Sequence, residues 1–394
     1  MNELSLLKEG FKKTYNKDYD KLYFSPGRVN LIGEHIDYNG GKVLPMAISL
    51  GIYAAICYRS DNLVRAVSNG FNVSPIEFKI DNLVKEDDFT DYIKGVIYEI
   101  SHFTNKKIDK GFDLYLLSNL PAASGLSSSA CLELLTSHII NDYYKLGISD
   151  LDLVLLSQKA EREFVKVNCG IMDQFAIGMA IANKAILLDT SNINYEYHDF
   201  VINGATLVII NTNKPRALVE SKYNERRSEC EIALKLLNDL TKTSKNNLCE
   251  YSMDIVNKYK DSLTDTLYRR VRHVVTENDR VNKAIVALNN HDLSNFGKLL
   301  NESHISLKDD YEVSGLNLDV ICLELQKSNL VYGARMTGAG FGGCAIALFK
   351  TTDFKKIDEI MEGIKKVYKE KTNIVLSYYE AESENRTGEI KWIY

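Results

Sequence analysis

Polar side chains crowd into one glycine-bounded segment near the N-terminus, GRVNLIGEHIDYNGG, which covers residues 27–41. The segment carries an arginine, two carboxylates and three neutral hydrogen-bonding side chains, namely Arg28, Glu34, His35, Asp37, Tyr38 and Asn39. Each hydroxyl of a sugar both donates and accepts hydrogen bonds, so a sugar site has to supply both kinds of partner. The segment therefore suits a small polyhydroxylated ligand. A solvated polar turn between two strands is the alternative interpretation.

A second glycine turn, NLPAASGLSSSACLELL at residues 119–135, leads from a predicted strand into a predicted helix. The first N–H groups of a helix have no partner within it and lie at the positive end of its dipole, which favours an anion. Gly125 can take backbone angles that other residues avoid, and this lets the chain approach a phosphate closely. Helix capping by Ser127 is the alternative interpretation. Three consecutive serines exceed what a cap requires, so we favour a phosphate site.

Other phosphate-binding patterns are missing from the chain. It contains no GxxxxGK[ST] sequence and neither HRD nor DFG, which excludes a Walker A site and a protein kinase. Gly338, Gly340 and Gly343 match GxGxxG, but they lead into the apolar, strand-like run CAIALF. A dinucleotide fingerprint should open a helix, so we reject that interpretation. A glycine-rich hairpin turn fits the local pattern of this third loop, and the functional interpretation is that the loop packs beside the phosphate site.

Composition narrows the class of protein further. The chain has 394 residues, 45% of them hydrophobic, which is enough for two domains or one large one. The net charge of −5 and the lack of a dense basic tract argue against a nucleic-acid partner. No apolar run approaches ~18 residues, so no membrane segment is expected. Seven cysteines without close pairs are typical of reduced thiols in a cytoplasmic protein.

Strand-like runs and helical patterns alternate along the chain. Strands are predicted at residues 21–24, 42–58, 112–119, 205–212, 333–336, 344–349 and 373–381. Helices are predicted at residues 127–146, 150–166 and 354–368, and helical patterns dominate between residues 212 and 329. The pattern indicates an α+β or mixed α/β protein, with a boundary between two lobes around residues 190–203.

The three glycine segments together resemble the three motifs of the GHMP kinases, and the first resembles the galactokinase branch of that family. Agreement continues through residues 160–175, 221–231, 269–278 and 301–314, which read AEREF with CGIMDQF, SKYNERRSECE, RRVRHVVTEN and NESHISLKDDYEVS. The resemblance spans nearly the whole chain. It implies a two-lobed α+β fold of mixed sheets and helices with the active site between the lobes. Its N-terminal domain would cover residues 1–195 and its C-terminal domain residues 196–394.

The resemblance also implies an activity, the transfer of phosphate from ATP to the anomeric hydroxyl of D-galactose with Mg²⁺ as cofactor. Asp173 would be the general base, and Arg28 would lie beside the transferring group. The implied sugar-binding residues are Glu34, His35, Ile36, Asp37, Gly170 and Tyr223. The implied nucleotide-binding residues are Ser68, Ala123, Ser124, Gly125, Leu126, Ser127, Ser128 and Ser129. The implied Mg²⁺ ligands are Ser129 and Glu161.

The residues themselves support part of this assignment. An aspartate in the apolar run GIMDQFAIG is costly to bury unless it is paired, and Arg28 is a suitable partner for Asp173. Capping of a helix start is the alternative role for this aspartate. Without the resemblance, Glu161 would be interpreted as a solvated helical charge beside Arg162. Without the resemblance, nothing would distinguish Tyr223 from the other tyrosines among the 23 in the chain.

Four positions depart from the family pattern. Ile36 stands where a threonine is usual, and Ala123, Lys166 and Ala339 stand in place of glycines. Alanine requires ordinary backbone angles, so we expect no positive φ at the two alanine positions. Lys166 brings a bulky cation near the active-site segment.

Two other functions stay open from the sequence: an N-acetylgalactosamine kinase, and a galactose and ATP sensor without catalysis. The intact serine run argues against the sensor. The implied partners are the small molecules galactose and ATP, without nucleic acid or membrane. The sequence leaves the oligomeric state undecided and is compatible with a monomer.

Overall fold

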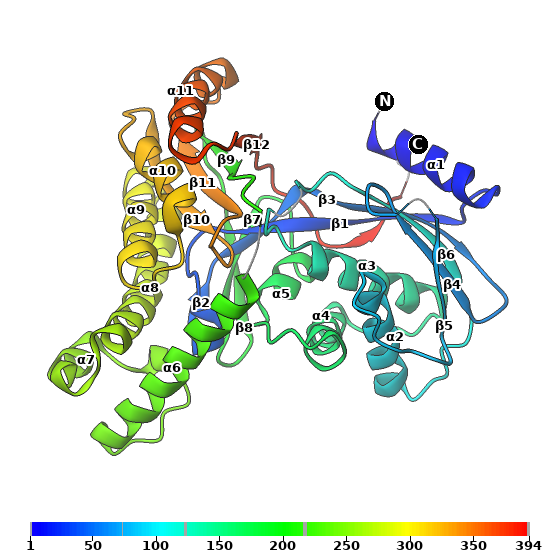
Figure 1. Ribbon diagram of the computed structural model, residues 1–394, viewed down its shortest axis with the longest axis horizontal. Helices are drawn as coiled ribbons and strands as arrows, with labels where there is room; N and C mark the ends of the chain where they lie inside the picture. The colour runs from blue at the N-terminus through cyan, green and yellow to red at the C-terminus, as the bar shows by residue number, and fades with distance from the viewer. Residues whose placement is uncertain (1, 73, 122–123, 216–218, 392–394) are drawn as a thin grey trace.

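The computed structural model describes residues 2–72, 74–121, 124–215 and 219–391, and Figure 1 shows their arrangement in two lobes. The helices are α1 Glu3–Tyr15, α2 Thr90–Thr104, α3 Ser128–Tyr143, α4 Asp150–Ala160, α5 Met172–Gly178, α6 Val219–Thr241, α7 Met253–Lys258, α8 Asp265–Asn289, α9 Leu293–Asp309, α10 Gly315–Gln326 and α11 Phe354–Thr372. The strands are β1 Lys21–Asn30, β2 Lys42–Val43, β3 Pro45–Tyr58, β4 Leu63–Ser68, β5 Ile76–Lys79, β6 Phe112–Ser118, β7 Lys184–Asp189, β8 Asn194–Asp199, β9 Thr206–Asn211, β10 Val331–Thr337, β11 Cys344–Phe349, β12 Ser377–Glu380 and β13 Gly388–Glu389. The predicted α+β class is confirmed.

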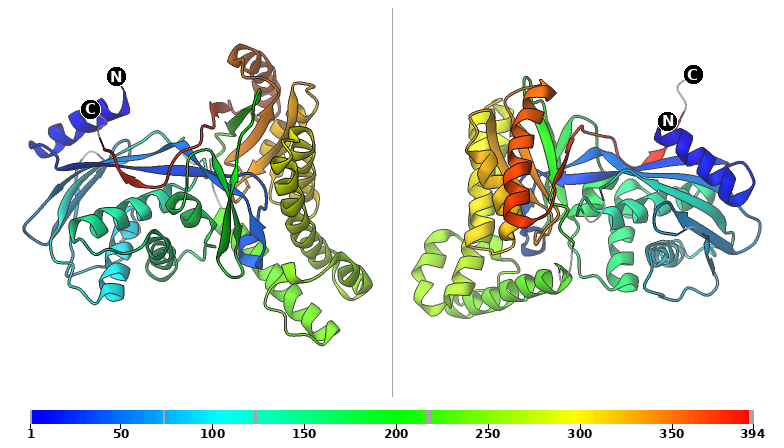
Figure 2. Two further views of the ribbon diagram at one scale, coloured as in Figure 1. Left: turned by 180° about the vertical axis from the view of Figure 1, so that it is seen from behind. Right: turned by 45° about the horizontal axis from the view of Figure 1, so that its top comes forward.

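The N-terminal lobe is built on a six-stranded sheet in the order β13-β1-β3-β6-β4-β5, with β4 and β6 parallel and the other neighbours antiparallel. Helix α1 covers one face, where Leu7 and Phe11 pack against Tyr115 and Leu117. Helices α2–α5 lie on the opposite face, as Figure 2 shows. The sheet is therefore buried on both sides, which explains the long apolar runs in β3 and β6.

The C-terminal lobe is built on a four-stranded antiparallel sheet in the order β10-β11-β9-β12. Every residue of β9 and β11 is buried, in agreement with the predicted apolar strands there. Helix α10 and helix α9 pack on this sheet, and α8 packs on α9. A small third sheet, β2-β7-β8, joins the two lobes. In the part of the chain that the structure describes, no helix is both long enough and apolar enough to cross a membrane.

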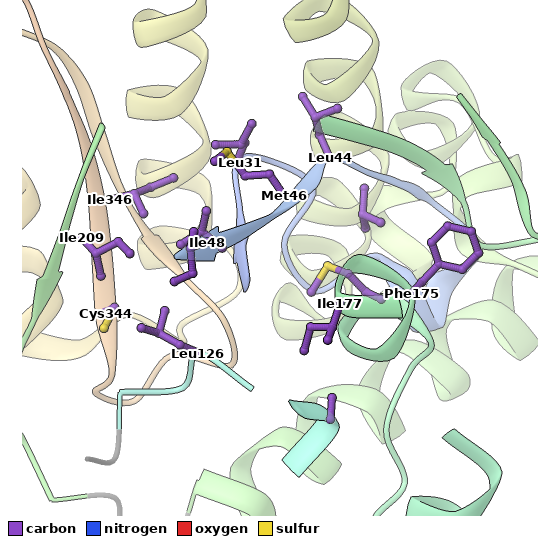
Figure 3. Close-up of a cluster of buried hydrophobic side chains, with 14 of the residues drawn as sticks. Leu31, Leu44, Met46, Ile48, Leu126, Phe175, Ile177, Ile209, Cys344 and Ile346 are labelled. Carbon is purple, nitrogen blue, oxygen red and sulfur yellow. The ribbon is translucent and has the colours of Figure 1, made fainter. Parts of the chain in front are cut away.

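The two lobes share one hydrophobic core. Figure 3 shows Ile48 and Leu126 of the N-terminal lobe beside Ile209, Cys344 and Ile346 of the C-terminal lobe, and all five belong to the same buried cluster. The chain also returns at its end to the first sheet, because β13 pairs with β1. The division into two domains at residue 195 stays a prediction. The last strand, β13, follows that position in the chain but belongs to the sheet of the N-terminal lobe.

Two predicted elements differ from the structure near the first motif. The strand expected at residues 21–24 continues to Asn30, with a shift in register between Pro26 and Gly27. Arg28 therefore lies on a strand rather than in a loop, because the bulge lets pairing resume beyond Gly27. The strand expected at residues 42–58 splits into β2 and β3, which belong to different sheets. The helices expected at 127–146, 150–166 and 354–368 are confirmed, although the second ends in a π-helical turn, Glu161–Val165.

Candidate active site

One cavity of about 840 Å³ lies where the first motif, the phosphate turn and the third glycine loop meet. Most of the predicted site residues line it, namely Arg28, Glu34, His35, Asp37, Ser124, Gly125, Ser127, Ser128, Ser129, Glu161, Gly170, Asp173 and Tyr223. Ile36 and Leu126 are not among the lining residues, and their side chains are buried. Ser68 is not among the lining residues, although Asn69, which follows it, is. Ala123 lies outside the described residues.

An ion pair between Arg28 and Asp173 lies in this cavity. Arg28 Nε donates to Asp173 Oδ1 at 2.8 Å, and Nη2 donates to Oδ2 at 2.7 Å. Its remaining nitrogen, Nη1, donates to the carbonyl oxygen of Gly125 at 2.8 Å. Burial acts to lower the pKa of Arg28, but the charge of Asp173 outweighs it and raises that pKa. The predicted pairing is confirmed, and one arginine connects the aspartate to the phosphate turn.

Ser127 does not cap helix α3, which was the alternative role predicted for it. It precedes α3 with a left-handed φ of 67°, and its side chain caps no helical N–H group. Its hydroxyl donates to Asp173 Oδ2 at 2.5 Å instead. The helix-cap interpretation of Ser127 is therefore wrong. The bonds of Asp173 to two side chains also argue against a capping role for this aspartate.

Two further carboxylates of the first motif line the cavity. Glu34 accepts a hydrogen bond from Arg335 Nη2 at 2.8 Å; burial raises its pKa, although Arg335 and Arg28 act to lower it. Burial, together with the charges of Asp173 and Glu34, raises the pKa of Asp37 to about 7. Gly170 lies directly against Asp37, since a side chain at this glycine would overlap Oδ2 of the aspartate. The site thus places several oxygen acceptors around one space, as a polyhydroxylated ligand requires.

The ring of His35 is occupied by protein partners. Its Nε2 lies 3.1 Å from the carbonyl oxygen of Ala339, and its Nδ1 lies 2.8 Å from the hydroxyl of Tyr38. Burial lowers the pKa of His35 to about 3, so the ring is neutral. Because a carbonyl only accepts, the proton is assigned to Nε2, and Nδ1 accepts from Tyr38. Tyr223 from α6 packs nearby, with its ring centre 5.6 Å from that of His35.

Glu161 is buried in the π-helical turn that ends the second predicted helix. The interpretation as a solvated charge is therefore wrong. Nε2 of Gln174 donates to Glu161 Oε2 at 2.6 Å and to Glu133 Oε2 at 2.9 Å. Burial raises the pKa of Glu161, with a further contribution from Asp173. Glu133 and Gln174 are not among the predicted site residues. Their one sign in the sequence is the lone charge of Glu133 in the buried helical run of α3.

The chemistry of these oxygen donors fits Mg²⁺ bound together with a phosphate. Ser129, in the first turn of α3, and Glu161, in the π-helical turn after α4, both line the cavity. Among the described residues, no three His, Cys, Asp or Glu side chains gather as a metal cage. Mg²⁺ characteristically takes one or two protein carboxylates and completes its shell with phosphate and water. The residues present match that pattern.

The third glycine loop packs beside the phosphate turn, as predicted. A side-chain carbon at Gly338 would lie 3.2 Å from the carbonyl oxygen of Gly125. The loop continues into strand β11, which confirms the rejection of a dinucleotide fingerprint. Ala339 keeps an ordinary negative φ, as expected, whereas Lys166 adopts a left-handed φ of 73°.

Comparison with known proteins agrees with this geometry. The galactokinase galactose-binding signature matches residues 9–58, and the N-terminal and C-terminal domains of the GHMP kinases match residues 91–180 and 284–370. A galactokinase of Clostridium acetobutylicum is 48% identical over 383 residues, which is 96% of this chain and 97% of that protein. A galactokinase of Fusobacterium nucleatum is 44% identical and covers 99% of each chain.

Solved structures show the same relationship. The crystal structure of Lactococcus lactis galactokinase complexed with galactose superposes with a TM-score of 0.93 at 42% identity, covering 99% of this chain and 100% of the other. The mevalonate kinase of Methanococcus jannaschii shares the fold, with a TM-score of 0.67 at 20% identity over 93% of this chain and 99% of that one. The identities to curated galactokinases extend over nearly the whole chain, through all three motifs that build the cavity. The chain belongs to the galactokinase family of GHMP kinases.

Proposed function

We propose that this protein transfers the γ-phosphoryl group of ATP to the anomeric hydroxyl of D-galactose and releases galactose 1-phosphate and ADP. The observation that carries the proposal is the Arg28–Asp173 pair, because it lies in one cavity between the first motif and the phosphate turn. Phosphoryl transfer depends on in-line positioning and on cations that offset spreading negative charge. The galactose complex of the Lactococcus lactis relative supports the choice of sugar.

At the sugar end, Glu34, Asp37 and Tyr223 supply acceptors and a donor for the hydroxyls, and Gly170 leaves room for Asp37. His35 also lines this wall, and we assign Ile36 to the sugar site from the family pattern. Polar groups matched to the axial hydroxyl discriminate against a sugar that leaves them unpaired.

At the reacting centre, the anomeric oxygen attacks the γ-phosphorus while the bond to the ADP oxygen breaks. Asp173 orients that hydroxyl and takes its proton, and Ser127 holds the carboxylate by the 2.5 Å hydrogen bond. Arg28 offsets the charge that develops on the transferring group.

At the nucleotide end, Ser124, Gly125, Ser127, Ser128 and Ser129 line the cavity, where the N–H groups at the start of α3 would bind the phosphates. Leu126 contributes its backbone, since its side chain is buried. We assign Ala123 and Ser68 to the same nucleotide site from the family pattern. Ser129 and Glu161 would hold Mg²⁺, which neutralises phosphate charge when it is bound.

The test is release of ADP from Mg-ATP with galactose, with N-acetylgalactosamine, with glucose and without sugar. Galactose-dependent release supports the proposal, and release with N-acetylgalactosamine alone would move the assignment to that substrate. Galactose binding without release would favour a sensor. In Asp173→Ala, turnover should nearly vanish while galactose binding stays measurable; full turnover would contradict the assigned role.

We further propose a cytoplasmic location, which the seven cysteines without close pairs favour. We also propose that residues 1–195 and 196–394 form the two functional halves of the enzyme. The first half then holds the sugar and phosphate loops, and the second holds Tyr223 and the third glycine loop.

A further inference from the structure

We propose that Glu277 and His273 on α8 are positioning residues that hold the sugar-binding segment in its binding shape from outside the cavity. This inference rests on the proposed galactose-binding function. Both residues belong to RRVRHVVTEN at residues 269–278, a part of the chain to which no role in the reaction has been given. They are four residues apart, so their side chains leave the same face of the helix.

Glu277 binds the backbone of the sugar-binding segment. Its Oε1 accepts from the N–H groups of Gly33 at 3.0 Å and Glu34 at 3.3 Å, and from the Ser303 hydroxyl at 2.7 Å. Its Oε2 accepts from Arg280 Nε at 2.7 Å. A fully buried carboxylate with this set of donors fixes the two successive N–H groups in one orientation.

His273 fixes the other end of the same residue. Its Nε2 donates to the carbonyl oxygen of Glu34 at 3.0 Å, and its ring is fully buried. The N–H and the carbonyl group of Glu34 are therefore both bound by one face of α8. Gly33, which has a left-handed φ of 99°, makes the turn that presents Glu34 to this face.

Arg335 on β10 completes the arrangement. Its Nη1 donates to the carbonyl oxygens of Asn30 at 2.9 Å and Leu31 at 3.1 Å, and its Nη2 donates to Glu34 Oε2 at 2.8 Å. Arg335, His273 and Glu277 are not among the described residues that line the cavity. They can therefore affect the sugar only through Glu34 and its neighbours.

The two lobes therefore have different roles in binding the sugar. The N-terminal lobe contributes the sugar-binding segment, and the C-terminal lobe sets its shape at three points on Glu34. A binding group has to be held within roughly 0.5 Å to recognise its ligand well, and such precision comes from supporting residues. Loss of one support should therefore weaken galactose binding more than nucleotide binding, because the phosphate turn has other anchors.

The experiment is calorimetric titration of Glu277→Gln with galactose and, separately, with ADP. We expect the Kd for galactose to rise by about five- to tenfold, because the variant loses one charged hydrogen bond. The Kd for ADP should stay within about twofold of its original value. Asp113→Asn is the matched control, since Asp113 is also a fully buried carboxylate held by cations, Lys17, Arg59 and Arg65, but on β6. It should lower the melting temperature and leave both Kd values unchanged.

A second pair of variants tests the inference independently of Glu277→Gln folding. His273→Leu should weaken galactose binding, and His273→Gln, which can still donate to Glu34, should restore most of it. An unchanged galactose Kd in folded Glu277→Gln or His273→Leu would overturn the inference, as would equal losses for galactose and ADP. If the unmodified protein binds no galactose, the proposed function itself fails.

Discussion

Gly170 and Asp37 fit against each other so closely that the glycine leaves space for one oxygen of the carboxylate. A side-chain carbon at Gly170 would overlap Asp37 Oδ2, although the backbone of Gly170 has no left-handed φ. The need for glycine at this position is therefore steric and concerns the sugar-binding carboxylate directly. The two residues come from segments more than a hundred positions apart, so the contact could not be seen in the sequence.

Gly170→Ala should displace Asp37 and raise the KM for galactose by roughly tenfold or more, because small misplacements of a binding group are costly. The KM for ATP should change little. Initial rates at varied galactose and at varied ATP measure both constants. Gly363→Ala in α11 is the control, since nothing lies near the added carbon there. Equal changes in both KM values for Gly170→Ala would contradict a local effect on Asp37.

Ser127→Ala should lower kcat by about tenfold, because Asp173 loses a hydrogen bond to its charged form. Galactose affinity should stay close to that of the unmodified protein. Steady-state rates and a galactose titration separate the two effects. Ser149→Ala is a matched change, since Ser149 also precedes a helix but caps it by accepting from Asp152 N–H. That variant should lose stability, by about 1 kcal/mol, and keep its kcat.

Acid should destabilise the fold through His35. Its pKa is about 3 in the folded protein and 6.5 in an unconstrained chain. Between these values the unfolded chain binds a proton that the folded ring does not, so stability falls as the pH falls from 6.5. The contribution to the slope is about 1.4 kcal/mol per pH unit. His35→Gln should remove it, which urea unfolding between pH 6.5 and 4.5 would measure; parallel curves for the two proteins would contradict the buried neutral ring.

Lys166→Gly should stabilise the protein relative to Lys166→Ala by about 1 kcal/mol, because only glycine takes the left-handed φ of 73° without strain. Both variants remove the same exposed side chain, so the comparison isolates the backbone. Thermal unfolding should show a melting temperature roughly 2 °C higher for the glycine variant. The two should show equal turnover of galactose. Equal melting temperatures would contradict the prediction, because they would mean that the alanine variant avoids the left-handed φ at residue 166.

The local patterns of the sequence predicted many of the elements, although α1, α2, α5, β4, β5, β7 and β8 were not predicted. Continuous apolar runs gave β9 and β11, and the helical periodicity gave α3, α4 and α11, because burial on two faces or on one stripe leaves a direct trace in the residue order. The bulge that extends β1 to Asn30 and the break between β2 and β3 were missed, since both depend on which strands lie alongside. The pairing of Arg28 with Asp173 was predicted from the cost of burying an unpaired carboxylate.

The α+β class, the three glycine loops and the chemistry that they carry follow from the order of residue types, because glycine, serine and charged residues mark turns and anion sites locally. How these parts support one another becomes visible in the folded protein. Ser127 binds Asp173 rather than capping a helix, Glu161 is buried, and α8 holds the backbone around Glu34. Each of these facts joins residues distant along the chain, and such contacts are set by how the two lobes pack rather than by the spacing of residue types.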